Sequence, residues 1–253
     1  MLLRDKTAIV HGAGGAIGGA VARAFAAEGA RVHLCGRSLA RVALVARDIA
    51  AAGGAAEAAE VDALDAAAVE RHAAAVAAGG GIDVVFNAVG FAVVQGTPLV
   101  DIAPADFAHP ITSWTMTQFL TARAAARHMA VRGSGVVLLL SASPARLAIG
   151  LTGGFGVACA AVEGLSRTLA AELGPRSVRV VCIRSHRVGE TLAGGADFPM
   201  PPAEFVRLLE DMTLLRRLPS LDDLARTAVF IASDHAAGMT GAVANLTGGM
   251  SPD

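Results

Sequence analysis

Short β-branched runs alternate with alanine-rich stretches along almost the whole of the 253-residue chain. The runs predict strands and the stretches predict helices, and their alternation is typical of βαβ units around a parallel sheet. The strand-like runs lack polar alternation, which indicates that helices cover both faces of the sheet. The pattern therefore predicts an α/β fold, a Rossmann-like doubly wound domain with about seven parallel strands.

The boundaries follow from the same periods. We expect strands over residues 7–11, 31–35, 56–61, 82–87, 135–141, 178–184 and 242–246. Helices are expected over residues 16–28, 39–52, 66–78, 104–132, 154–173, 202–211 and 221–233. No linker divides the chain, so residues 1–253 are interpreted as one domain. The stretch 189–202 breaks both periods with Gly, Pro and Asp, which predicts a mobile substrate loop beside a site.

The composition argues against several classes of function. The formal net charge is −1 and no basic block exists, so neither nucleic acid nor an anionic membrane surface is an expected partner. Cys35, Cys159 and Cys182 are too scattered for a disulfide framework or a zinc site, which predicts a reducing, cytoplasmic compartment and no bound metal. The chain has no run of ~20 uncharged apolar residues and no pattern of a signal peptide, so we expect a soluble protein that is not exported.

Two residue types are nearly missing from this composition. The chain has no tyrosine, and Lys6 is its only lysine, since every other basic residue except histidine is arginine. A mechanism that needs a catalytic tyrosine or an interior lysine is therefore excluded.

The first predicted strand is followed by a glycine-rich segment that leads directly into a helix, His11-Gly12-Ala13-Gly14-Gly15-Ala16-Ile17-Gly18. Such glycines let the backbone turn tightly and approach a pyrophosphate, which the free N–H groups of the helix N-terminus bind. The second predicted strand ends at Gly36-Arg37-Ser38, where an acidic residue would hold the ribose of NAD. An arginine suits the 2′-phosphate of NADP instead, so we expect NADP(H) as the cofactor.

From Lys6 to about Met250 the ordered motifs resemble those of the short-chain dehydrogenase/reductase family. The family's Thr-Gly-x-x-x-Gly-x-Gly motif corresponds to His11, Gly12, Ala16 and Gly18, its adenine-contacting acid to Asp62, and its Asn-Asn-Ala-Gly motif to Asn87-Ala88-Val89-Gly90. Together, the loop argument and the resemblance imply a cofactor site made of Gly12, Gly14, Gly15, Ala16, Ile17, Gly18, Arg37, Ser38, Asp62, Ala63, Asn87, Ala88 and Gly90.

The same resemblance implies that the family's catalytic residues are replaced. Phe155 stands at the position of the family's tyrosine, Cys159 at that of its lysine, and Trp114 at that of its asparagine. The family's serine corresponds to Ser141 or Ser143, with a slight preference for Ser141. His186, in the loop after the sixth predicted strand, is a candidate proton donor in place of the tyrosine, because imidazole titrates near neutrality.

Three functions remain open at this stage. The first is an atypical NADP(H)-dependent oxidoreductase that acts on a small apolar organic substrate without the Tyr/Lys proton donor. The second is a non-redox protein of the same fold, either an isomerase- or cyclase-type catalyst or an inactive binding protein. The third is a structural partner of a catalytic homologue. In the family, helices 104–132 and 154–173 form the subunit interface, so the resemblance implies a homo-oligomer, a dimer or a tetramer.

Overall fold

Seven parallel strands form the centre of the computed structural model, which describes residues 1–192 and 201–251. The strand order is β3-β2-β1-β4-β5-β6-β7, so successive strands are added towards one edge of the sheet up to β3 and towards the other edge from β4 onwards. The order therefore reverses between the neighbouring strands β1 and β4. The strands are β1 (Thr7–His11), β2 (Arg31–Gly36), β3 (Ala55–Glu60), β4 (Val84–Asn87), β5 (Gly135–Ala142), β6 (Val178–Ser185) and β7 (Val243–Leu246). Ligands bind where the order of such a sheet reverses, at the carboxyl ends of the strands.

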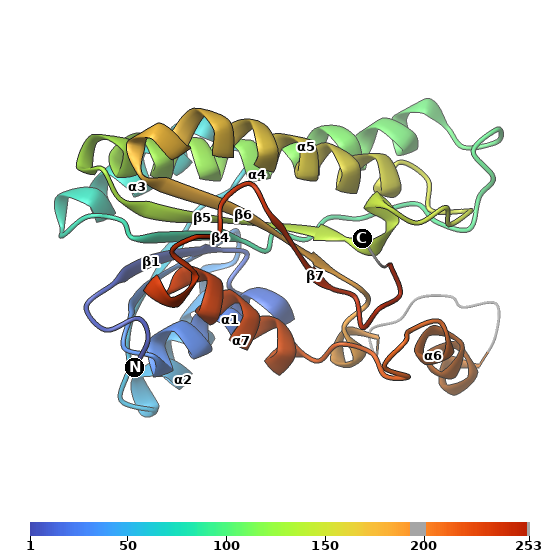
Figure 1. Cartoon of the computed structure of the whole chain (residues 1–253), viewed down its shortest axis with the longest axis horizontal. Coiled ribbons are helices and arrows are strands. Elements are labelled where there is room, and N and C mark those ends of the chain that lie inside the picture. Colours follow the sequence, from blue (N-terminus) through green and yellow to red (C-terminus); the bar gives the residue numbers. More distant parts are fainter. Residues whose placement is uncertain (193–200, 252–253) are drawn as a thin grey trace.

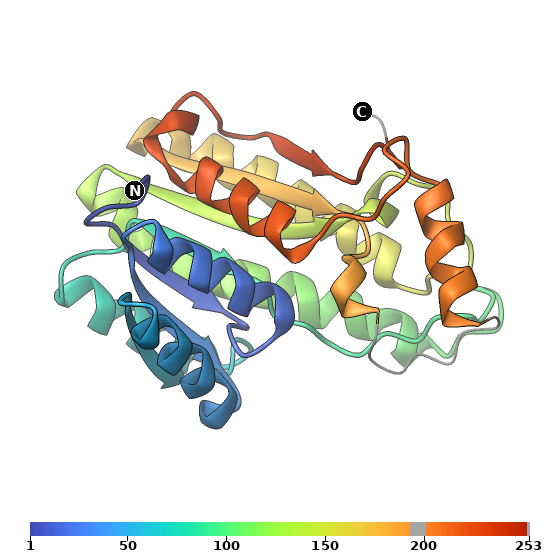
Figure 2. The ribbon, with the colours of Figure 1, turned by 90° about the horizontal axis from the view of Figure 1, so that it is seen from below.

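Helices cover both faces of this sheet. The helices of the described residues are α1 (Ala16–Ala27), α2 (Leu39–Ala51), α3 (Ala66–Ala78), α4 (Pro104–Arg132), α5 (Phe155–Leu173), α6 (Pro202–Asp211) and α7 (Leu221–Ala232). In Figure 1, α3, α4 and α5 lie above the sheet and α1, α2 and α7 lie below it. Figure 2 shows α1 and α7 side by side across the lower face, while α6 stands apart at one end. The predicted Rossmann-like fold is confirmed.

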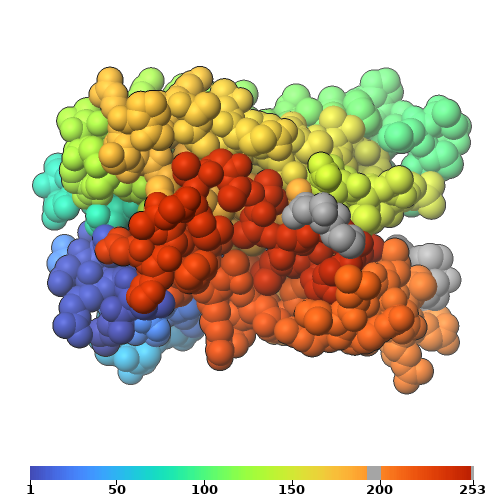
Figure 3. Space-filling view, viewed as in Figure 1, coloured from blue at the N-terminus to red at the C-terminus, as the bar shows by residue number. Residues whose placement is uncertain are grey.

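Alternation along each strand divides the buried side chains between two cores. Val10 of β1 packs with α1, α2 and α7, whereas its neighbour Ile9 packs with α3, α4 and α5. The edge strand β7 and the adjoining C-terminal segment lie across the front of the molecule between these two layers, as the space-filling view shows (Figure 3). None of the described helices is long and apolar enough to cross a membrane.

The predicted boundaries differ from the observed ones by a residue or two at most. β4 begins at Val84, where the sequence predicted a strand from residue 82, and β3 spans Ala55–Glu60 rather than residues 56–61. The predicted mobile loop over residues 189–202 lies partly outside the described residues. At its two described ends, Gly189–Thr191 form a short 3-10 helix and Pro202 begins α6.

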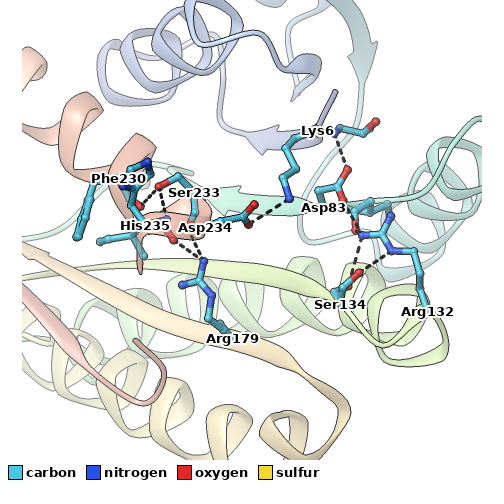
Figure 4. Close-up of polar contacts among 12 residues, drawn as sticks. Lys6, Asp83, Arg132, Ser134, Arg179, Phe230, Ser233, Asp234 and His235 are labelled. Atoms are coloured by element: carbon cyan, nitrogen blue, oxygen red, sulfur yellow. Dashed lines mark hydrogen bonds and ion pairs between the residues drawn. The ribbon is translucent and has the colours of Figure 1, made fainter. Parts of the chain in front are cut away.

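Charged side chains join the loops at the amino ends of the strands (Figure 4). Lys6 Nζ lies 3.3 Å from Asp234 Oδ1, and the Arg132 guanidinium lies 2.9 Å from Asp83 Oδ1. Arg179 donates to carbonyl groups at the end of α7, including that of Ile231 at 2.8 Å. The only lysine of the chain is therefore placed at the edge of the sheet opposite to the carboxyl ends of the strands.

Candidate functional site

A cavity of about 380 Å³ opens at the carboxyl ends of β1, β2, β3 and β4. Of the predicted cofactor residues, all except Gly18 and Asn87 line it: Gly12, Gly14, Gly15, Ala16, Ile17, Arg37, Ser38, Asp62, Ala63, Ala88 and Gly90. Seven further residues line the cavity that were not in the predicted set: His11, Gly36 and Val89, which belong to the quoted motifs, and Arg41, Val42, Val61 and Thr191. Segments far apart in the sequence thus meet around one cavity.

The glycine-rich loop fits closely against the segment after β4. Gly12 has φ +75°, and a Cβ added there would lie 2.5 Å from the carbonyl oxygen of Ala88. A Cβ on Gly18 would overlap the carbonyl oxygen of Gly12, so Gly18 shapes the loop from behind rather than lining the cavity. The next helix, α1, has no side-chain cap and no acid in its first turn. Its first N–H groups are therefore available to an anion in the cavity.

Two arginines stand at the end of β2. Arg37 and Arg41 both line the cavity, and Ser38 Oγ accepts a hydrogen bond of 3.5 Å from Arg41 N at the start of α2. Arg41 lies one helical turn after Arg37, and that spacing is the signal that could have identified it in the sequence. No carboxylate belongs to this strand end. Guanidinium groups bind a phosphate better than a ribose hydroxyl, so the residue types at this strand end suit an anionic ligand group.

Asn87 acts from behind the cavity. Its Nδ2 donates to the carbonyl oxygen of Thr117 and to Thr121 Oγ1, both at 2.9 Å and both on α4. Its Oδ1 accepts from Val89 N at 2.9 Å. Both polar atoms of the buried amide thus hold the segment after β4 against α4, and that segment forms one wall of the cavity.

Next along the carboxyl edge, Ser143 and His186 form a buried pair. Ser143 Oγ lies 2.9 Å from His186 Nδ1, while Nε2 of the same ring is buried without a partner among the described residues. Burial, and secondarily the positive charge of Arg187, lower the pKa of His186 to about 4. The imidazole is therefore neutral at pH 7, and its buried Nε2 has no hydrogen-bond partner among the described residues.

Ser141 belongs to a different network. Its hydroxyl donates to Glu163 Oε1 at 2.9 Å, and the same carboxylate binds Arg184 through Nε at 2.7 Å and a terminal nitrogen at 2.9 Å. Arg184 and Ser141 are register partners on β6 and β5, and Glu163 reaches both from α5. Ser141 and Ser143, the two serines that the sequence could not separate, therefore have different surroundings: Ser141 completes an ion pair and Ser143 contacts a neutral histidine.

An aromatic cluster of Phe91, Trp114 and Phe155 lies at the start of α5, the helix that contacts the 3-10 turn beginning at Ser143. The ring of Trp114 stacks on that of Phe155 with centroids 5.2 Å apart and planes at 7°, and Phe91 lies 5.0 Å from Trp114 and 6.4 Å from Phe155. Cys159, one turn after Phe155 on α5, is fully buried, and burial raises the pKa of its thiol to about 12. Trp114, Phe155 and Cys159, which the sequence resemblance predicted at the positions of the family's asparagine, tyrosine and lysine, thus belong to an apolar, uncharged wall.

Comparisons with known proteins agree with this architecture. The profile of the Enoyl-(Acyl carrier protein) reductase family matches residues 12–251. The chain is 32% identical over 248 residues to the D-threitol dehydrogenase of Mycolicibacterium smegmatis, covering 98% of this chain and 93% of that one. It is 34% identical over 259 residues to the L-rhamnose 1-dehydrogenase (NAD(P)(+)) of Azotobacter vinelandii, covering 99% and 98%.

Solved structures give the same answer. A putative short-chain alcohol dehydrogenase from Sinorhizobium meliloti superimposes with a TM-score of 0.89 at 28% identity, covering 98% of this chain and 97% of that one. A gluconate 5-dehydrogenase from Burkholderia cenocepacia in complex with NADP and tartrate superimposes with a TM-score of 0.87 at 25% identity, covering 98% and 96%. On its fold, its motifs and these similarities, the chain belongs to the short-chain dehydrogenase/reductase family of oxidoreductases.

Proposed function

We propose that this protein is an NADP(H)-dependent oxidoreductase that acts on a small apolar organic substrate without a tyrosine–lysine proton donor. The arginine pair at the end of β2 carries the cofactor part of the proposal, because Arg37 and Arg41 line the cavity with no acid on that strand end. When bound, the nicotinamide supplies or accepts a hydride, which is two electrons and a proton in one transfer.

The chain's own residues bind the cofactor, exclude water and contact the substrate. The N-terminus of α1 and the two arginines bind phosphate groups, and Asn87 keeps the segment after β4 in place. The aromatic wall of Trp114 and Phe155 excludes water from the reacting carbon. Of the proposed catalytic residues, Ser143 and His186 are the better placed, since the unpaired Nε2 can hydrogen-bond a substrate. The Ser141 hydroxyl is already committed to Glu163.

Calorimetry with NADPH and NADH tests the cofactor assignment. We expect NADPH to bind roughly tenfold to a hundredfold more tightly, since hydrogen bonds to charged groups contribute about 1.5–3 kcal/mol. Arg37→Ala and Arg41→Ala should weaken NADPH and leave NADH unchanged. Arg47→Ala is the matched control, because Arg47 lies on the same helix but outside the cavity, with its guanidinium on the carbonyl of Ala43. Equal affinity for the two cofactors would refute the NADP(H) assignment.

A second candidate function rests on the missing proton donors. If NADPH binds and no carbonyl, enone or iminium compound is reduced, the protein belongs with the non-redox catalysts or binding proteins of this fold.

Self-association is a separate part of the proposal: Met116 on α4 and Val157 on α5 are exposed apolar residues, which supports a dimer or tetramer built on these helices. Light scattering of the isolated chain measures this and distinguishes it from dependence on a catalytic homologue.

A further inference from the structure

The scarcity of proton donors beside Phe91, Trp114 and Phe155 restricts which reductions this site can catalyse. Reduction of a neutral carbonyl adds a hydride to carbon and a proton to oxygen, so it needs an acid. The chain has no tyrosine, and Lys6 lies at the opposite edge of the sheet (Figure 4). Cys159 is a buried thiol whose pKa is raised to about 12. The pKa of His186 is about 4, so its imidazole is neutral at pH 7 and has no acidic imidazolium proton to donate. Neither Cys159 nor His186 is therefore a strong proton donor at pH 7.

The fixed charges nearby are already engaged. The positive charge of Arg184 faces the Glu163 carboxylate through two hydrogen bonds, and both side chains are buried. The guanidinium of Arg187 donates to Gln95 Oε1 at 3.2 Å and lies 5.8 Å from the centroid of the Phe205 ring. The aromatic wall itself carries no cation. Where an ammonium group from the protein would repel a positively charged substrate, this wall has the neutral thiol of Cys159 instead.

The rings of the cluster add an attraction. The faces of Trp and Phe rings carry partial negative charge, and a cation within ≈ 6 Å of a ring centroid is stabilised, most strongly where water is excluded. Phe91 and Phe155 are only half-buried, so part of each ring remains open, and both lie within 6.4 Å of each other and beside Trp114. Phe91 directly follows Gly90, which lines the cofactor cavity, so the cluster and the cavity are continuous along the chain.

We infer that the substrate of this site is a cationic iminium compound, whose positive charge rests against the rings of Phe91, Trp114 and Phe155. The inference rests on the proposed NADPH-dependent reduction and specifies its substrate class. The iminium carbon accepts a hydride, the C–H bond forms, and the π pair of the C=N bond becomes the lone pair of a neutral amine. The reduced nicotinamide is oxidised in the same step. Charge and electrons balance without any proton, so no acid is required.

The kinetic test compares two compounds of one shape, an N-methyl dihydroisoquinolinium ion and the neutral ketone tetralone. With NADPH, we expect kcat/KM for the iminium to exceed that for the ketone by about a hundredfold or more, because general acid catalysis contributes 10²–10⁴-fold to carbonyl chemistry and is missing here. The iminium rate should be constant between about pH 6 and pH 9, since burial places the pKa of His186 at about 4 and that of Cys159 at about 12, both outside this range. The other polar and charged side chains of this region are Ser143, the paired Glu163 and Arg184, and Arg187.

A binding measurement gives a second readout that does not depend on turnover. Trp114 is the only tryptophan of the chain, so intrinsic tryptophan fluorescence reports on this cluster alone. In the NADPH-bound protein, whose nicotinamide is neutral, we expect an N,N-dimethyl tetrahydroisoquinolinium ion to change that fluorescence at a concentration at least about tenfold lower than its neutral carbon analogue, dimethyltetralin. Phe155→Leu should remove most of this preference, whereas Phe155→Tyr should keep it. Phe230→Leu, an exposed aromatic on α7, is the matched control and should change nothing.

The outcomes separate the two levels of the proposal. Faster reduction of tetralone than of the iminium, or equal binding of the cation and its neutral analogue, overturns the inference and leaves an NADPH-dependent reductase. Binding of NADPH with reduction of neither compound also overturns the inference. Failure of NADPH itself to bind refutes the proposed function at its first step.

Discussion

Glu163 and Arg184 form an ion pair that is almost completely shielded from water, with side chains 5% and 3% exposed. Replacing Glu163 by Gln keeps the size and shape of the side chain but leaves the positive charge of Arg184 without its carboxylate. Removal of one partner from a buried pair costs about 3–5 kcal/mol, because the remaining charge keeps its desolvation penalty and loses the compensating attraction. In a domain of this size each kcal/mol lowers Tm by about 2–4 °C, so we expect Glu163→Gln to lower Tm by roughly 6–20 °C.

Urea and thermal unfolding of matched variants measure this effect. Asp222→Asn is the control, since it breaks the exposed Asp222–Arg226 pair one helical turn apart on α7, where about 0.3–0.5 kcal/mol is expected. The double replacement Glu163→Leu with Arg184→Met should be less destabilised than Glu163→Gln alone, because it leaves no buried charge. A loss for Glu163→Gln no larger than that for Asp222→Asn would show that burial of the Glu163–Arg184 pair does not raise its contribution to stability.

Further predictions concern protonation, backbone strain and thiol chemistry. Burial lowers the pKa of His11 to about 3 and that of His186 to about 4, both below the unfolded value of 6.5. The unfolded chain therefore takes up more protons, and the free energy of unfolding should fall as pH drops from 6.5 towards 4. His186→Asn should reduce this pH dependence in urea titrations, and an unchanged dependence would contradict the lowered pKa of His186. Gly12→Ala should abolish NADPH binding in calorimetry and cost more stability than Gly53→Ala, because both glycines have positive φ but only Gly12 would place a Cβ against a carbonyl group; equal losses would show that the close approach at Ala88 does not matter. All three cysteines are buried and burial raises each thiol pKa, so a thiol reagent at pH 8 should label none in the native protein and three after unfolding; rapid labelling of the native chain would disprove this.

Much of the fold was predictable from local patterns. The strand predicted over residues 7–11 is β1 (Thr7–His11), and the helix predicted over residues 66–78 is α3, begun by the Asp65 side chain that accepts from Ala68 N at 3.0 Å. The hydrophobic period of a helix or strand and the N-cap of a helix each involve only a few neighbouring residues, so they can be recognised in the sequence. The strand start predicted at residue 82 and the strand end predicted at residue 61 were wrong, because hydrogen bonding to the neighbouring strand, not the residue types, decides where a strand begins and ends.

The candidate site was predictable only where its residues are neighbours in sequence. The glycine-rich loop and Arg37 follow their strands directly, and the structure places them around one cavity. Arg41 was missed although its spacing from Arg37 was a usable signal. The partner of His186 was not predictable, because Ser143 lies 43 residues away and the contact depends on the parallel register of β5 and β6.

Three features follow from the order of residues alone: strands and helices alternate, a glycine-rich turn precedes α1, and no tyrosine or interior lysine is present for catalysis. Residue types and short-range periods are properties of the chain alone. The contacts of Ser141 with Glu163, of Ser143 with His186 and of Trp114 with Phe155 follow instead from the folded arrangement. These contacts join distant segments, so they exist only once sheet order and helix packing have brought the segments together.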